Sequence, residues 1–387
     1  MSVAIPTIHN RPEELRPALE SILACKPAKL VLVTTYNNHE ALSRVAETLQ
    51  NPGCVEIEVL RVDKANKRLQ VCKALEDDHV KTAITVMADD DVEWPSTLMP
   101  WLLAPFEDDK MGGVGTCQRV KRVDGDVMTS VFNWLGAAYI ERRNFEISAT
   151  HNIDGGTSCM SGRTGAYRTE ILKSSGFLRN FKHEKWGTYI LNADDDNFVT
   201  RWLVAYGWKT WIQYEPECEI ETTLENSIKF LYQCSRWARS NWRSNWTSLV
   251  DEKYVITYVL SVVVSLLLLT SANQSSQQPW CTYALHVATF TSLAFVVDPL
   301  LLFSCWWGTE NWEPRNRHIL LGAEVTFMFG FTKVVKLVGL FRRNPHDLLF
   351  LPVSIIFGYL HGLIKLYATF TLKEVNDQGP PSHVLSV

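Results

Sequence analysis

The sequence predicts an α/β domain with a mostly parallel sheet, followed by helices that cross a membrane. Up to about residue 225, charged and apolar residues are mixed as in a soluble domain, whereas long apolar stretches dominate from Tyr254 onward. In the first part, strand-like segments alternate with helix-like segments. This order is typical of βαβ units, in which helices cover a parallel sheet.

The expected elements of this domain follow one another closely. Strands are expected at residues 3–8, 30–35, 55–62 and 83–87, and helices at residues 12–24, 40–50, 65–77 and 197–206. No GxGxxG or GxxxxGK[ST] segment follows the first strand, so neither a dinucleotide fold nor a P-loop is indicated. In sheets of this kind, ligands bind at the carboxyl ends of the strands.

Three adjacent carboxylates, Asp89, Asp90 and Asp91, come directly after the fourth expected strand. Asp89 and Asp91 have D-x-D spacing and can converge on one cation where the backbone turns. Mg²⁺ and Mn²⁺ prefer carboxylate oxygens combined with substrate phosphates. A metal ion at this position would neutralise a departing diphosphate. The alternative is a solvated acidic turn.

A second acidic cluster, Asp194, Asp195 and Asp196, precedes the helix expected at residues 197–206. Carboxylates at a helix N-terminus complement the helix dipole, which accounts for one or two acids better than for three. The functional interpretation is a general base that takes a proton from an attacking hydroxyl group.

Basic residues occur in two places that suit a phosphorylated ligand. After the third strand, cations for phosphate are offered by Lys64, Lys67 and Arg68, although such a run taken alone is more often a solvated loop. Residues 226–250 contain no acid, and Arg236, Arg239 and Arg243 share one helical face there. Such a basic, tryptophan-rich helix before a membrane span is expected to lie in the membrane interface.

Four apolar segments are candidates for membrane spans of about 20 residues: residues 254–272, 280–305, 319–341 and 348–370. With the N-terminal domain in the cytosol, the loop 273–279 is expected outside and the loop 308–317, with Arg315 and Arg317, inside. The basic residues in the third segment and directly after it instead indicate an interfacial helix: Lys333, Lys336, Arg342 and Arg343.

Net charge and cysteine spacing exclude some classes of function. The net charge of −4 argues against a general nucleic-acid binder. Nine cysteines lack the spacing of a zinc site, so we expect reduced thiols in a cytosol-facing domain. No signal peptide precedes the first strand, and the soluble domain is expected to begin at the first residue.

Four motifs together resemble the membrane-bound, processive family-2 glycosyltransferases, the group of the hyaluronan, cellulose and chitin synthases. The resemblance is closest to hyaluronan-synthase-like fungal polysaccharide synthases. "DDDVEWP" is similar to the D-x-D motif, "SCMSGRTGAYR" to S-G-x-x-G-x-Y-R, "DDDNFVTRWL" to G/E-D-D, and "QCSRW" to Q-x-x-R-W. The likeness extends from about residue 3 to residue 370, with the motifs in the expected order.

The resemblance implies a GT-A (nucleotide-diphospho-sugar transferase) fold and an inverting transfer from a UDP-sugar to a growing polysaccharide. Asp196 would be the base, with Asp195 beside it, and Asp89 and Asp91 would hold Mg²⁺ or Mn²⁺. The implied substrate-binding residues are Lys64, Lys67, Arg68, Asp89, Ser161, Gly162, Tyr167, Arg168, Gln233, Arg236 and Trp237. The implied location is the plasma membrane, with the catalytic domain cytosolic and the polymer exported across the bilayer.

The expected domains are a GT-A domain (1–224), an interfacial helix with Q-x-x-R-W (225–250), transmembrane helices (251–372) and a tail (373–387). The chain departs from the family in three places. "VTTYNN" has no aspartate where the family contacts uracil, no spans precede the domain, and the tail lacks a W-G-T-R-like sequence. Two alternatives therefore stay open: a non-processive enzyme that glycosylates a membrane lipid, and an inactive, truncated scaffold subunit.

Overall fold

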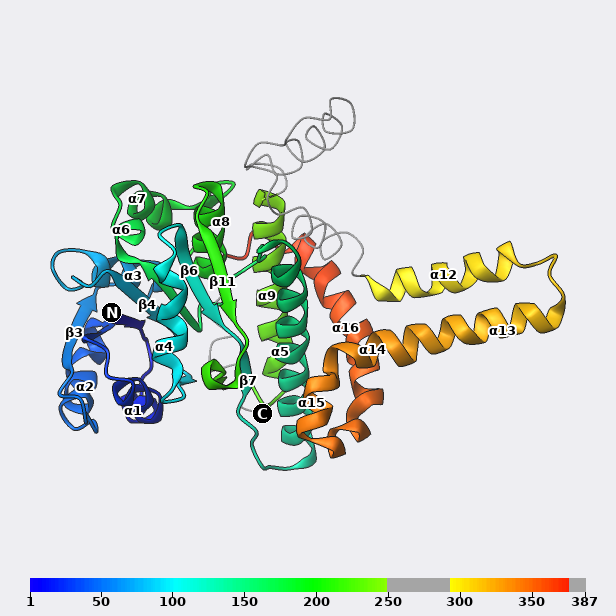
Figure 1. The fold of residues 1–387 in the computed structure, drawn as a ribbon, viewed down its shortest axis with the longest axis horizontal. Coiled ribbons are helices and arrows are strands. Elements are labelled where there is room, and N and C mark those ends of the chain that lie inside the picture. The colour runs from blue at the N-terminus through cyan, green and yellow to red at the C-terminus, as the bar shows by residue number, and fades with distance from the viewer. Residues whose placement is uncertain (249–292, 376–387) are drawn as a thin grey trace, which may run out of the picture.

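The computed structural model describes residues 1–248 and 293–375, and a seven-stranded mixed sheet forms the centre of its N-terminal domain (Figure 1). The strand order is β11-β6-β8-β4-β1-β2-β3. These strands are β1 (Ser2–Pro6), β2 (Lys29–Thr35), β3 (Glu56–Val62), β4 (Ile84–Ala88), β6 (Met111–Thr116), β8 (Thr164–Arg168) and β11 (Lys209–Gln213).

The prediction of a mostly parallel sheet is confirmed for the four strands that begin the chain. Strand β1 pairs in parallel with both β2 and β4, so that Ala4 lies between Val31 and Met87. Strand β8 runs antiparallel to both β4 and β6, which makes the sheet mixed. The sequence did not indicate β8 as a strand, because its glycine and its motif residues obscure the strand pattern.

Helices cover both faces of the sheet. They include the 3₁₀ turn η1 (Pro12–Leu15), α1 (Arg16–Ala24), α2 (Tyr36–Glu47), α3 (Lys67–Leu75), α4 (Leu98–Leu103), α6 (Thr169–Leu172), α7 (Ser175–His183) and α8 (Asp195–Ala205). One core packs α1 against β1 and β4 through Leu19, Ile22 and Val86. A second core packs β8 against α7 and α8. Every helix expected in residues 1–225 is present, with ends shifted by a few residues.

A small second sheet closes the end of the domain next to the acidic triplet. It consists of β5 (Val92–Glu93), β12 (Ile220–Thr222) and β7 (Gln118–Val120). Strand β5 follows Asp91 immediately, and Thr222 pairs with Val92, so β12 holds the triplet from the side. These short strands were not expected from the sequence, since two or three residues carry no periodicity.

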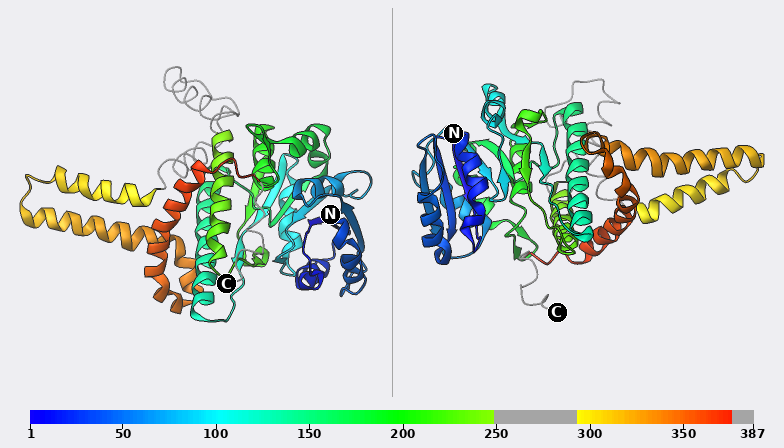
Figure 2. Two further views of the ribbon diagram at one scale, coloured as in Figure 1. Left: turned by 180° about the vertical axis from the view of Figure 1, so that it is seen from behind. Right: turned by 90° about the horizontal axis from the view of Figure 1, so that it is seen from below.

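A helical layer packs beside the sheet domain. It contains α5 (Val127–Asp154), α9 (Lys229–Trp246) and α16 (Leu351–Phe370), and α9 lies along α16 (Figures 1 and 2). Trp134, Phe230 and Phe357 bring the three helices into one apolar core. The interfacial position expected for residues 225–250 stays a prediction. Arg239 and Arg243 of α9 are buried against protein and do not face a lipid surface.

Two apolar helices extend away from this body as an antiparallel pair, α12 (Ala294–Gly308) and α13 (Pro314–Val325) (Figures 1 and 2). Within the described residues, two helical runs are long and apolar enough to cross a membrane, Pro314–Arg343 and Pro345–Phe370. They coincide with the third and fourth expected spans. The first expected span and residues 280–292 of the second lie outside the described residues.

The run that begins with α13 turns back toward the body. It passes through a π-helical turn η7 (Thr326–Phe331), α14 (Thr332–Val334) and η8 (Val335–Leu337) to α15 (Val338–Arg343). There Lys336 pairs with Glu146 of α5 at 2.6 Å, and Arg343 pairs with Glu141. Lys336 and Arg343 thus pair with acids of α5, in the helical layer beside the sheet domain, and the interfacial helix stays a prediction.

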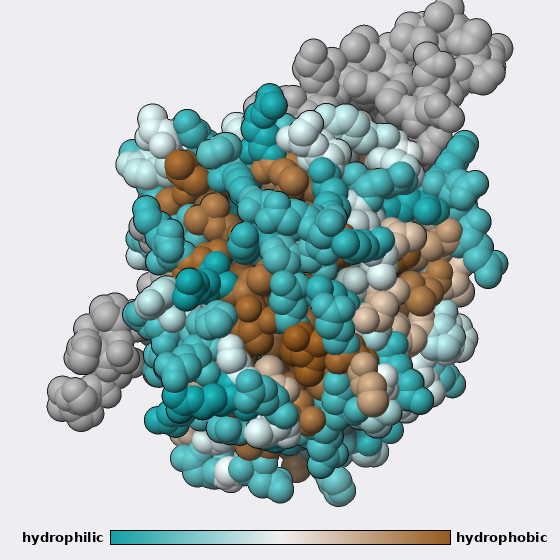
Figure 3. Space-filling model, turned by 90° about the vertical axis from the view of Figure 1, so that its left-hand side faces the viewer, coloured by the Kyte–Doolittle hydropathy of each residue, from teal (hydrophilic) through white to brown (hydrophobic). Residues whose placement is uncertain are grey.

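The two ends of the molecule differ in surface character. The face at the left of Figure 1 is mainly hydrophilic, with smaller hydrophobic patches (Figure 3). At the other end, α12, α13 and η7 expose large apolar side chains: Leu300, Phe303, Trp307, Ile319, Phe327 and Phe331. The visible face of the sheet domain is thus mainly hydrophilic, whereas the projecting helices expose large apolar side chains.

Candidate active site

A pocket of about 1000 Å³ opens at the carboxyl ends of β1 and β4. Its walls come from the start of α3, the turn after β4, the segment before β8, the start of α8, and one face of both α5 and α9. Both acidic triplets line it, although about a hundred residues separate them in the chain. This is the position at which open α/β sheets bind ligands.

Lys67 joins the two acidic clusters. Its Nζ lies 2.7 Å from Asp89 Oδ1 and 2.9 Å from Asp195 Oδ2. Burial disfavours the ammonium form, but the charges of Asp195 and Asp89 outweigh burial and raise the pKa of Lys67. Burial likewise opposes ionisation of Asp195, yet Lys67 holds the pKa of that carboxyl below its ordinary value. Both groups are therefore charged at neutral pH.

Asp196 has a different environment from Asp195. Its Oδ1 accepts a hydrogen bond from the Asn197 main-chain N–H at 2.8 Å, and its Oδ2 accepts one from the Gly162 N–H at 3.3 Å. Burial, followed by the neighbouring charge of Asp195, raises the pKa of Asp196. Of these two adjacent carboxyls, Asp195 is firmly ionised and Asp196 is more basic. A proton acceptor needs the greater basicity.

The D-x-D turn is held from three sides. The Asp89 N–H donates to the Arg163 carbonyl at 3.1 Å, and the Thr7 hydroxyl donates to Asp90. Asp91 Oδ2 accepts from the Thr222 hydroxyl at 3.3 Å. The Asp91 carboxylate is exposed at the pocket, and desolvation by the surrounding protein, followed by the neighbouring charge of Asp89, raises its pKa to about 6.

An aromatic wall faces the acids. Trp237 of α9 stacks on Tyr139 of α5 with ring centroids 5.0 Å apart, and the Arg163 guanidinium lies 5.5 Å from the Trp237 centroid. Arg163 Nε donates to Thr222 Oγ1 at 3.1 Å, so the same arginine contacts both the aromatic wall and the strand that holds Asp91. Gln233 and Arg236, on the same face of α9, also line the pocket.

The structure brings most of the expected site residues together. The pocket lining contains Lys67, Asp89, Asp91, Ser161, Gly162, Asp195, Asp196, Gln233, Arg236 and Trp237. Gly162 stands at the closest approach. A Cβ on it would lie 3.2 Å from Lys67 Nζ and 3.4 Å from Asp196 Cβ. A side chain there would push Lys67 or Asp196 away from its position.

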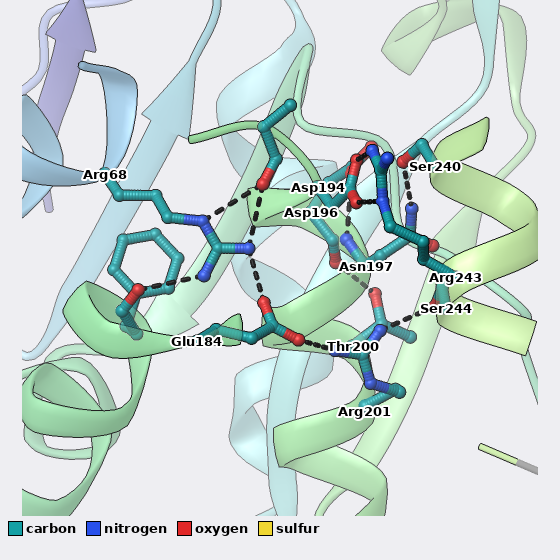
Figure 4. Close-up of polar contacts among 12 residues, drawn as sticks. Arg68, Glu184, Asp194, Asp196, Asn197, Thr200, Arg201, Ser240, Arg243 and Ser244 are labelled. Carbon is teal, nitrogen blue, oxygen red and sulfur yellow. Dashed lines mark hydrogen bonds and ion pairs between the residues drawn. The ribbon is translucent and has the colours of Figure 1, made fainter. Parts of the chain in front are cut away.

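Four expected binding residues lie outside the pocket lining: Lys64, Arg68, Tyr167 and Arg168. Arg68 is buried and bonds to Glu184 and to the carbonyls of Ala193 and Phe181 (Figure 4). The Arg168 guanidinium donates to the carbonyls of Phe106, Asp108 and Met111. Tyr167 is fully buried in the core beneath the site. In this structure Arg68, Tyr167 and Arg168 support the fold.

Several lining residues escaped the sequence analysis, among them Thr7, Gln70, Arg143, Cys159 and Asn192. Gln70 Nε2 donates to the carbonyls of Thr7 and Val33, which ties α3 to the ends of β1 and β2. Arg143 donates to the Cys159 carbonyl at 3.2 Å from the middle of α5. Single polar residues of this kind carry no spacing signal. They are identified only by the tertiary structure, which places them in the pocket lining.

The donor set suits a divalent cation that also binds substrate. In the described part of the chain, no three His, Cys, Asp or Glu side chains converge as a preformed cation cage. Asp89 pairs with Lys67, whereas desolvation and the neighbouring charge of Asp89 raise the pKa of Asp91 to about 6, so a further cation beside Asp91 would be favourable. Mg²⁺ is commonly held by one or two carboxylates together with substrate phosphates, and this site offers that set.

The fold and the site together define an α/β enzyme domain with a charged substrate pocket at the carboxyl ends of its strands. Residues 1–240 match the family model described as "Glycosyltransferase like family 2". The chain belongs to glycosyltransferase family 2, and it is a family-2 glycosyltransferase by its high identity to curated members.

The chain is 66% identical over 373 residues to a type 2 glycosyltransferase of Gibberella zeae, covering 96% of this chain and 66% of that protein. It is 64% identical to a type 2 glycosyltransferase of Pyricularia oryzae, covering 96% of this chain and 72% of that protein. More distant similarity reaches human hyaluronan synthase 3, with 29% identity over 163 residues, 41% of this chain and 28% of that protein. The chain thus spans about two thirds of the Gibberella zeae relative.

Proposed function

We propose that this protein transfers a sugar from a UDP-sugar to a growing polysaccharide at a membrane, with inversion at the anomeric carbon and export of the polymer. The observation that carries this proposal is the Lys67 bridge between Asp89 and Asp195. A single lysine side chain thus connects the residues proposed to bind the diphosphate with those proposed to deprotonate the acceptor hydroxyl.

In the proposed mechanism, Asp196 takes the proton of the acceptor hydroxyl as that oxygen attacks the anomeric carbon. The raised pKa of Asp196 suits this role, since a base works best when its pKa is near the working pH. The N–H groups of Gly162 and Asn197 orient its two oxygens. Asp195 keeps Lys67 in place throughout.

The departing UDP would be stabilised by positive charge next to its phosphates. Lys67 and Arg236 line the pocket and would contact the phosphates. Asp89 and Asp91 would hold Mg²⁺ or Mn²⁺, which supplies Lewis-acid neutralisation of the diphosphate when bound. The aromatic wall of Trp237 would receive the acceptor sugar.

Two features support polymer synthesis at a membrane. The helical runs Pro314–Arg343 and Pro345–Phe370 are long and apolar enough to cross a bilayer. Relatives over nearly the whole chain include the hyaluronan synthase of Streptococcus pyogenes, at 22% identity over 96% of this chain. Helix α16 packs directly on α9, which carries the Q-x-x-R-W residues, so the site and the apolar helices form one unit.

The decisive experiment measures UDP release by purified membranes supplied with Mn²⁺ and one UDP-sugar at a time. Wild-type protein is expected to release UDP, and Asp196→Asn is expected to abolish release while it still inserts into the membrane. Asp78→Asn, a surface carboxylate that pairs with Lys81, serves as the matched control and should keep wild-type turnover. Unchanged turnover in Asp196→Asn would remove Asp196 from the role of base.

The product then separates polymer synthesis from single transfer. A large product that linkage-specific hydrolases digest supports a polysaccharide synthase. A lipid that carries one sugar contradicts polymer synthesis and supports the non-processive alternative. No UDP release from any UDP-sugar, with intact Mn²⁺-dependent UDP binding, would support the inactive scaffold.

A further inference from the structure

A buried ion pair lies directly before the proposed base. Arg243 of α9 binds Asp194 through two contacts, Nε to Oδ2 at 2.7 Å and Nη2 to Oδ1 at 3.2 Å (Figure 4). Both residues are buried, Arg243 at 1% and Asp194 at 6% exposure. Planar, two-point binding of this kind fixes direction as well as distance. Asp194 is therefore held in one orientation.

The backbone of Asp194 gives this contact a consequence for the site. Asp194 has φ +65°, a left-handed conformation in which residues other than glycine are uncommon. It is the cap residue from which α8 begins, and Asp195 and Asp196 are the first two residues of that helix. The torsion angles at Asp194 thus determine where both carboxyl groups point.

Two further contacts fasten α8 to α9 on the same side. Asn197 Nδ2 donates to Ser240 Oγ at 3.0 Å, and Arg201 Nη1 donates to Ser244 Oγ at 2.6 Å (Figure 4). Arg243 stands between these serines on α9. Of these three residues of α9, Arg243 is the one that contacts Asp194, the residue with the left-handed conformation.

Arg243 also reaches the chain that follows α16. Its Nη1 donates to the carbonyl of Leu372 at 3.3 Å and to that of Glu374 at 3.4 Å. One turn earlier on α9, Arg239 pairs with the Glu374 carboxylate at 3.1 Å. The segment after the last apolar helix is therefore fastened to α9, and through Arg243 it is connected to the turn before the base.

We propose that Arg243 is a positioning residue that sets the direction of Asp196 by clamping the left-handed turn at Asp194, with the Leu372–Glu374 segment as its third anchor. This inference rests on the proposed role of Asp196 as the base. Arg243 contacts neither proton nor substrate. It acts through Asp194, and its removal should reduce the chemical step more than the binding of the donor.

The test compares Arg243→Lys with Glu374→Gln in the full chain. Lysine keeps the positive charge but cannot form the two-point contact, and we expect kcat for UDP release to fall by about 10- to 100-fold, the cost of a small misplacement of a reacting group. The dissociation constant for UDP with Mn²⁺ should stay within about twofold. Glu374→Gln removes only the side-chain ion pair with Arg239 and keeps the main-chain carbonyls that anchor Arg243, so its kcat should stay within about twofold of wild type.

A glycine substitution distinguishes positioning from general stability. Glycine adopts φ +65° without strain, whereas alanine does not. We therefore expect Asp194→Gly to keep a kcat several-fold above that of Asp194→Ala. Amide exchange of residues 195–200 should accelerate in Asp194→Ala and Arg243→Lys but not in Glu374→Gln. The comparison of Asp194→Gly with Asp194→Ala needs no stable Arg243 variant, so the proposal stays testable if Arg243→Lys does not fold.

Several outcomes would overturn the inference: wild-type kcat in Arg243→Lys, equal losses in Arg243→Lys and Glu374→Gln, a weakened UDP affinity at unchanged kcat, or equal activity of the Asp194→Gly and Asp194→Ala variants. Failure of the proposed function is distinguishable, because it would appear as full turnover in Asp196→Asn. If Asp196→Asn is inactive and Arg243→Lys is normal, only the positioning role is wrong.

Discussion

The Lys67 ammonium lies 2.9 Å from Asp195 Oδ2, and this contact connects two parts of the chain that the sequence separates by more than a hundred residues. The same ammonium lies 2.7 Å from Asp89. One cation therefore neutralises a carboxylate from each acidic cluster. Without it, the two clusters would repel one another across the pocket.

Lys67→Met is therefore expected to reduce kcat/KM for UDP release by about 100-fold, the usual cost of removing one charge-stabilising group from a site. Lys64→Met, three residues earlier and outside the pocket lining, should have a much smaller effect. The measurement is UDP release at varied donor concentration. Equal losses in the two variants would mean that positive charge in the loop, and not the bridge, is what matters.

The pH dependence should reveal Asp196. Its folded-state pKa lies above the ordinary value of 3.8, so we expect the acid limb of kcat/KM to lie above pH 3.8. A carboxyl with a raised folded-state pKa contributes stability at low pH that is lost as pH rises through that pKa. Asp196→Asn should accordingly melt at or above the wild-type temperature at pH 7, and this difference should disappear at low pH. A clearly lower melting temperature of Asp196→Asn than of wild type at pH 7 would contradict the raised pKa of Asp196.

Arg68→Met should impair stability and leave donor binding intact. Glu184 accepts hydrogen bonds from both Arg68 and Arg201, and Arg68 also satisfies the carbonyls of Ala193 and Phe181 (Figure 4). Breaking a buried pair of this kind costs about 3 kcal/mol of unfolding free energy. Denaturant unfolding checks the loss, and calorimetry of the folded fraction checks UDP binding. A weaker UDP affinity at unchanged stability would return Arg68 to the phosphate site.

Gly162→Ala is expected to lower kcat by about tenfold, because the new methyl group would crowd Lys67 Nζ at 3.2 Å and Asp196 Cβ at 3.4 Å. Gly176→Ala is the matched control, since its nearest neighbours lie at 3.7 Å, an ordinary contact distance. UDP release by the two variants gives the comparison. If both retain wild-type kcat, the closeness of Gly162 to the base has no catalytic importance.

The projecting helices should mediate binding to a bilayer. Phe327 and Phe331 of η7 are 55% and 58% exposed, and replacing both with glutamate would remove about 2 kcal/mol of apolar burial for each ring placed in lipid. We expect less of this variant to float with phosphatidylcholine vesicles. Tyr206, which is 63% exposed on the sheet domain, provides a control through Tyr206→Glu. Equal flotation of all three proteins would exclude η7 as a lipid contact.

Much of the fold was predictable because its signals are local. Strands β1, β2, β3 and β4 and their helices appear in the sequence as alternating segments, and each acidic cluster immediately borders an element. Strand β8 was not predictable, since its antiparallel place between β4 and β6 depends on partners that are distant in the chain. The small sheet of β5, β7 and β12 was not predictable from the sequence for the same reason.

The sequence by itself determined which acids stand at the ends of strands and helices, because chain order places Asp89 after β4 and Asp196 at the start of α8. The tertiary structure decided which cations meet them. Lys67 and Arg68 are neighbours in the sequence, but successive residues of a helix point about 100° apart, so one enters the pocket and the other enters the core. Only the packing of α9 on α8 could pair Arg243 with Asp194, because long-range contacts leave no mark in local spacing.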